Sequence, residues 1–155
     1  MTTNAPGRLF LLITGILLAV FSVIGFFSTA FTLVIIDYWL PAYGGWDMRE
    51  VWMLFYGAGM LLSLYAVVVG ILGAVFHNKI NKGGLLLCLM VISLTLSVIH
   101  SIVYTVAVFY YDNVIGFASL VSIPFSLVLP ILFIVGAVKN KKAADFVDEY
   151  GNRRH

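Results

Sequence analysis

Long apolar stretches without any Asp, Glu, Lys or Arg dominate the chain. They cover residues 9–36, 51–76, 85–110 and 114–138, and the charged residues lie between them or beyond them. Each stretch exceeds the ~20 residues with which a helix crosses about 30 Å of hydrocarbon. Helices also satisfy their own backbone hydrogen bonds, as lipid requires. The pattern predicts an all-α, polytopic membrane protein that folds as an antiparallel four-helix transmembrane bundle.

The composition leaves little room for structure outside the membrane. Hydrophobic residues make up 62% of the 155 positions and charged residues only 10%, whereas about 25% of residues are charged in soluble domains. The segments between the apolar stretches are much shorter than the ~50 residues of a small domain. We therefore predict one membrane domain over residues 1–155, of which 139–155 form a short, weakly ordered cytoplasmic tail.

Basic residues are distributed unequally between the two sides of the predicted bundle. Of nine, only Arg49 lies on the side opposite the termini. The positive-inside rule therefore places both termini in the cytoplasm, and we expect the protein in the plasma membrane. The cluster Lys139, Lys141 and Lys142 should rest against anionic headgroups. The tail after residue 138 has too few cations to predict binding of nucleic acid.

The segment 37–50 joins the first two stretches on the predicted outer side. It contains Pro41, Gly44 and Gly45 among acidic and aromatic residues. Two interpretations are open: an interfacial loop whose aromatic side chains lie at headgroup depth, or a contact surface for a partner. The aromatic content favours the first.

Small residues recur along one face of the first and second stretches. The positions that we expect to pack helix against helix are Gly15, Gly59, Ala66, Gly70 and Ala74. In lipid, small residues let helix backbones approach closely, whereas large apolar side chains gain little by leaving the hydrocarbon. Replacing Gly70 by leucine should therefore destabilise the bundle.

The third stretch contains the one histidine predicted to lie deep in the membrane. His100 shares a helical face with Ser97, Ser101 and Tyr104, and Ser63 of the second stretch lies near the same depth. A buried imidazole needs hydrogen-bonding partners, so we predict a polar layer around it. The layer either binds a proton or small ligand, or it only joins helices through a neutral histidine. The isolation of His100 from acids favours the second interpretation.

Other chemistry has little support in the sequence. Cys88 is the only cysteine, so a dithiol is excluded. His77 and His100 lie at different depths, and the apolar stretches contain no carboxylate. We therefore predict no catalytic residue, no metal site, no cofactor and no enzymatic activity.

The fourth stretch leaves the membrane through Leu129-Pro130-Ile131-Leu132 and Gly136-Ala137-Val138-Lys139-Asn140-Lys141-Lys142. In this exit and in its four-span layout the chain resembles poorly characterised small four-span membrane proteins of bacteria. The resemblance implies a membrane location and supplies no activity. We expect a structural, accessory or partner-binding component that packs with itself or with a larger membrane partner. The alternative is a small channel or transporter subunit that uses the polar layer around His100.

Overall fold

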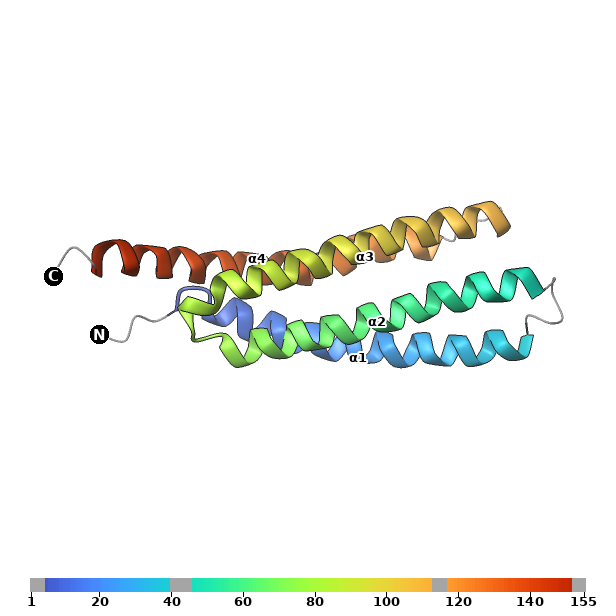
Figure 1. The fold of residues 1–155 in the computed structure, drawn as a ribbon, viewed down its shortest axis with the longest axis horizontal. Coiled ribbons are helices and arrows are strands. Elements are labelled where there is room, and N and C mark those ends of the chain that lie inside the picture. Colours follow the sequence, from blue (N-terminus) through green and yellow to red (C-terminus); the bar gives the residue numbers. More distant parts are fainter. Residues whose placement is uncertain (1–4, 40–45, 113–116, 152–155) are drawn as a thin grey trace.

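The computed structural model describes the backbone of residues 5–39, 46–112 and 117–151, and the side chains of residues 5–35, 50–106 and 127–147. Its elements are α1 (Arg8–Trp39), α2 (Trp46–Phe76), the short 3-10 helix η2 (Ile80–Lys82), α3 (Gly83–Asp112) and α4 (Phe117–Gly151). The four α-helices lie along one common direction (Figure 1). The predicted all-α helical bundle is confirmed.

Three of these helices contain segments that are long and apolar enough to cross a membrane. The segments are Arg8–Ile35 in α1, Glu50–Phe76 in α2, and Ile80–Val106, which covers η2 and most of α3. The predicted fourth span, 114–138, falls largely within α4, but the described side chains of α4 begin at residue 127. The fourth crossing therefore stays a prediction.

Helices that follow one another in the sequence run in opposite directions and pack side by side. Close contacts join α1 to α2, α2 to α3, α3 to α4, and α4 back to α1. The start of α1, the end of α4 and the α2–α3 connection lie at the same end of the bundle (Figure 1). We call this end, which carries Gly7, His77 and Asn140, the inner end, and the opposite one the outer end.

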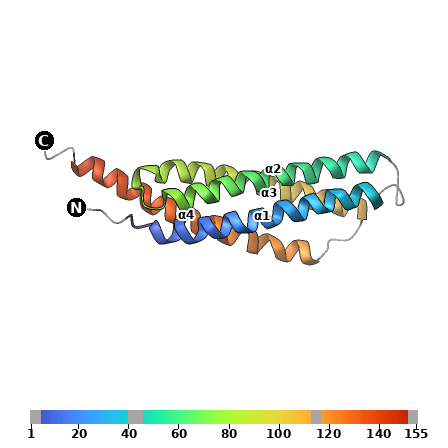
Figure 2. The same ribbon diagram turned by 90° about the horizontal axis from the view of Figure 1, so that it is seen from below.

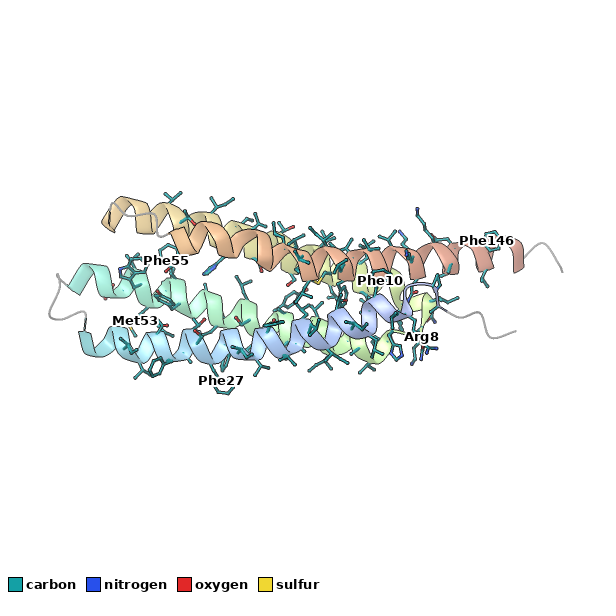
Figure 3. All side chains as sticks on the ribbon, turned by 180° about the vertical axis from the view of Figure 1, so that it is seen from behind. Arg8, Phe10, Phe27, Met53, Phe55 and Phe146 are labelled. Atoms are coloured by element: carbon teal, nitrogen blue, oxygen red, sulfur yellow. The ribbon has the colours of Figure 1, made fainter. Side chains whose placement is uncertain are left out.

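A buried core occupies the inner half of the bundle, and all four helices contribute to it. Its apolar side chains are Leu11, Leu18, Val69, Leu86, Met90, Phe133 and Ala137. Large apolar side chains elsewhere point outward, as Phe27 does on α1, whereas Phe10 lies between α1 and α4 (Figure 3). An apolar exterior around a small core is what a helical bundle in lipid requires.

Glycines allow the helices to approach closely in this inner half. A Cβ built on Gly7 would overlap the backbone of Gly136, and one on Gly83 would lie 2.9 Å from the Ala137 carbonyl oxygen. A Cβ on Gly73 would overlap the ring of Phe133. Larger side chains at these glycines would separate the helices, so the packing explains why they are small.

The segments outside the predicted spans are more helical than their composition suggests. The expected weakly ordered tail after residue 138 is wrong, because α4 continues as one helix to Gly151. Ala143 and Ala144 follow a lysine-rich segment, and both residue types favour helix. The predicted outer loop 37–50 is also too long, since α1 ends at Trp39 and α2 begins at Trp46.

A candidate binding cavity around His100

A cavity of about 1050 Å³ lies between the helix pairs, on the outer side of the buried core. All four helices contribute to it, and α3 does so from Met90 to Val106. The outer part of α4 turns away from α1 (Figure 2). The cavity is half-enclosed, so one side of it opens onto the surface of the bundle.

Many of the residues that line the cavity have small side chains, and larger side chains at these positions would fill it. Gly25, Gly59, Ser63, Ala66 and Ser97 all border it. A Cβ on Gly25 would meet only the Ser63 hydroxyl, at 3.6 Å. At the inner end, glycines bring backbones into contact, whereas here the small side chains leave a hollow.

His100 lines the cavity and bonds across to the neighbouring helix. Its Nε2 lies 3.1 Å from the backbone carbonyl oxygen of Phe55 in α2. Gly59 lies against the ring, because a Cβ there would stand 3.4 Å from the His100 Cε1 atom. A carbonyl oxygen can only accept, so Nε2 carries the proton, and in the neutral ring Nδ1 is a hydrogen-bond acceptor.

An aromatic cluster adjoins His100 toward the outer end. The ring of Tyr104 stacks on the imidazole with centroids 6.5 Å apart. The Tyr104 hydroxyl lies 3.3 Å from that of Tyr56, and Trp52 contacts both tyrosine rings, at 6.0 and 6.2 Å. The cluster joins α2 to α3 where the helices otherwise separate.

The structure gathers most of the predicted polar layer on one surface. Ser63, Ser97 and Ser101 border the same cavity as His100, whereas Tyr104 stands beside the imidazole without bordering the cavity. The role of Trp52 and Tyr56 was not predicted. Their spacing of four residues, which places both on one face of a helix, was the available signal.

The five predicted packing residues separate into two groups. Gly15, Gly70 and Ala74 lie at the α1–α2 contact, where a Cβ on Gly15 would stand 2.7 Å from the Gly70 carbonyl oxygen and 2.8 Å from the Ala74 nitrogen. Gly59 and Ala66 instead border the cavity. The two groups therefore have different neighbours although they share one stripe in the sequence.

Three hydroxyls on the cavity wall donate within their own helices. Thr29 donates to the Gly25 carbonyl at 2.8 Å and Ser63 to the Gly59 carbonyl at 2.9 Å. Thr105 donates to the Ser101 carbonyl at 2.8 Å. Each hydroxyl proton is thereby engaged, which leaves the oxygen lone pairs for the cavity.

A second polar contact closes the inner end and was not predicted. Asn140 is fully buried. Its Oδ1 accepts from the Gly7 nitrogen at 2.7 Å, and its Nδ2 donates to the His77 carbonyl at 3.2 Å. Beside it, the ammonium of Lys139 lies 4.7 Å from the centre of the Phe10 ring. One amide thus ties α4 to the start of α1 and to the residue after α2.

Among the described side chains, no group of three histidine, cysteine or acidic residues is arranged to hold a metal ion. Cys88 is exposed on the surface of the bundle. The described cavity wall thus offers hydrogen bonding and apolar contact.

These observations define a multi-pass helical membrane protein with a cavity in its outer half. Comparison with protein-family models, with curated proteins and with solved structures gives no significant match to this chain. The resemblance to small four-span bacterial proteins therefore rests on layout alone.

Proposed function

We propose that the protein is a non-enzymatic membrane component that binds another molecule inside the bilayer. The observation that carries this proposal is the half-enclosed cavity of about 1050 Å³ between its helix pairs. A bundle with a purely structural role has no need of such a hollow, because packing between helices is what stabilises it in lipid. The accessory role predicted from the sequence thereby acquires a specific binding site.

The inner end supports binding rather than passage. Between the cavity and the inner end, Leu11 and Phe133 are fully buried and Gly7 lies against Gly136. The cavity is therefore closed toward the inner end, and we propose that it opens sideways to the lipid. A molecule dissolved in the bilayer can enter from the side without crossing the protein.

A channel or transporter subunit that uses His100 is the second candidate. It is supported by the place of His100 on the cavity wall, since imidazole exchanges protons near neutral pH. The packed inner end weighs against a path through a single chain. Proton flux into proteoliposomes that is lost in His100→Ala would favour this candidate, and equal flux in the two proteins would remove it.

Binding at the cavity can be tested by native mass spectrometry of the protein extracted in mild detergent. Phenylalanine at Ala66 projects into the cavity, whereas phenylalanine at Leu64, which is exposed, projects away from it. We expect a bound small molecule in the wild type and Leu64→Phe but not in Ala66→Phe. Thermal unfolding of each variant verifies its fold.

Identical spectra for the three folded proteins would refute the cavity as a binding site. If Ala66→Phe does not fold, Ser97→Leu provides a second, smaller obstruction on the opposite wall. The same spectra report whether the chain packs with itself.

We further propose that the protein lies in the plasma membrane with its inner end in the cytoplasm. Support comes from the excess of basic residues at that end, where Lys139, Lys141 and Lys142 can meet anionic headgroups. In a Cys88→Ser background, a cysteine at Asn78 should react with an impermeant maleimide only after the cells are opened. Reaction in intact cells would reverse the orientation.

A further inference from the structure

We infer that the cavity takes an uncharged amphiphile that carries a hydroxyl group and a long hydrocarbon chain, with the hydroxyl donating to Nδ1 of His100. The inference rests on the proposed function, in which the cavity binds a molecule of the bilayer. It adds the chemical class of that molecule. Three properties of the described wall support it: its dimensions, its charge and its balance of donors and acceptors.

The dimensions of the cavity fit a chain molecule. The wall on α3 extends from Met90 to Val106, which is about 24 Å at 1.5 Å per residue. A volume of about 1050 Å³ spread over that length makes the cavity elongated, which is the shape that a chain molecule requires. The volume itself is near the upper end of small-molecule sites.

The wall selects against charge. None of its described residues is acidic, lysine or arginine. A phosphate, carboxylate or ammonium group here would lose its hydration without gaining an opposite charge, which is strongly unfavourable in a low-dielectric site. The headgroups of most membrane lipids are therefore excluded, and a neutral polar group is favoured.

The balance of donors and acceptors selects the kind of neutral group. Phe55 engages the Nε2 proton of His100, which leaves Nδ1 as an acceptor. Thr29, Ser63 and Thr105 engage their protons within their helices and also present lone pairs. Ser22, Ser93, Ser97 and Ser101 also border the cavity, and their hydroxyls can donate. An alcohol matches this mixed wall because it both donates and accepts, whereas a ketone or an ether cannot donate to Nδ1 of His100.

The space below His100 sets the length of the hydrocarbon chain. Met90 lies ten residues further toward the inner end on α3, a distance of about 15 Å. An extended chain covers about 1.2 Å per bond, so ~12 carbon atoms reach the floor. Leu18, Met90 and Pro130 are buried there and provide an apolar end.

The inference can be tested with three probes that share a twelve-carbon chain: 1-dodecanol, its methyl ether and the alkane dodecane. Delipidated protein in neutral detergent is titrated with each, and the shift in thermal unfolding reports binding. We expect the alcohol to bind three- to twentyfold more tightly than the ether, the range given by one intramembrane hydrogen bond. Ala66→Phe should abolish the shift, and Leu64→Phe should retain it.

Variants of His100 connect the preference to this side chain. Gln offers both a donor for the Phe55 carbonyl and an acceptor for the ligand, so His100→Gln should retain the preference for alcohol. His100→Phe fills a similar space without an acceptor and should bind alcohol and ether equally.

Equal binding of alcohol and ether by the wild type would overturn the inference, and so would a preference that persists in His100→Phe. If no probe binds, but the small molecule seen by native mass spectrometry is still lost in Ala66→Phe, the ligand class is wrong and the binding function stands. If no probe binds, and native mass spectrometry shows no bound molecule that is lost in Ala66→Phe, both proposals fail.

Discussion

Alanine at Gly70 should loosen the α1–α2 pair, although it adds only one methyl group. A Cβ at this position would stand 2.7 Å from both the Ala19 nitrogen and the Gly15 carbonyl oxygen, and 3.1 Å from the Ala19 Cβ. Two of these three atoms belong to the backbone of α1 and cannot rotate away. Restoring ordinary contact at 3.4 Å or more requires the helices to separate by roughly 1 Å, a distortion of the kind that overpacking imposes.

The expected loss is about 1–3 kcal/mol of unfolding free energy, the usual cost of forcing an extra methyl group into a packed site. Helix propensity offsets little of it, because helices persist in the unfolded state within a membrane. The matched control is Gly57→Ala on the same helix, where a Cβ would have no neighbour within 4 Å. That variant should lie within about 0.5 kcal/mol of the wild type.

Both variants can be measured by equilibrium unfolding in mixed micelles titrated with sodium dodecyl sulfate, with tryptophan fluorescence as the signal. Circular dichroism should report equal helix content. If Gly70→Ala is as stable as Gly57→Ala, α1 and α2 do not approach through Gly70, and the packing argument is refuted.

The same assay tests three other contacts. Asn140→Ala leaves the buried Gly7 nitrogen and the part-buried His77 carbonyl without a hydrogen bond and should cost about 2–4 kcal/mol. Asn78 is exposed, so Asn78→Ala should be neutral. Similar losses in the two variants would mean that the Asn140 amide does not hold the inner end together. Phe133→Ala empties a fully buried site and should cost about 3–5 kcal/mol, so a loss under 1 kcal/mol would contradict the core. Tyr56→Phe and Tyr104→Phe remove one shared hydrogen bond and should couple by about 0.6 kcal/mol in a double-mutant cycle; additive losses would mean that the hydroxyls do not interact.

Hydropathy alone predicted the fold class because lipid imposes a strong constraint on the chain. Apolar stretches of spanning length can only be helices, and short connections place consecutive helices side by side. The depth of His100 relative to Ser63, Ser97 and Ser101 follows from counting residues along helices. These are properties of single helices, which a sequence pattern records directly.

Contacts that depend on how helices cross were beyond the sequence. Asn140 lies among lysines in the sequence and would be expected at headgroup depth, yet it is fully buried. The partner of His100 is the backbone carbonyl of Phe55, a group that every residue carries and no pattern singles out. The cavity itself arises because the helix pairs approach closely at the inner end and lie farther apart around His100, which is a property of four helices together.

A hollow of about 1050 Å³ has a consequence for every binding measurement on this protein. If the cavity were empty, its molar volume would be about 600 mL/mol, several times the volume change of a typical unfolding reaction. An empty space of that size would be unstable, so in a membrane the cavity is always filled. Binding is then an exchange in which the ligand displaces hydrocarbon that is present at near-molar concentration. Apparent affinity will therefore vary with the acyl chains of the host bilayer, and the membrane acts as a competitor as well as a solvent.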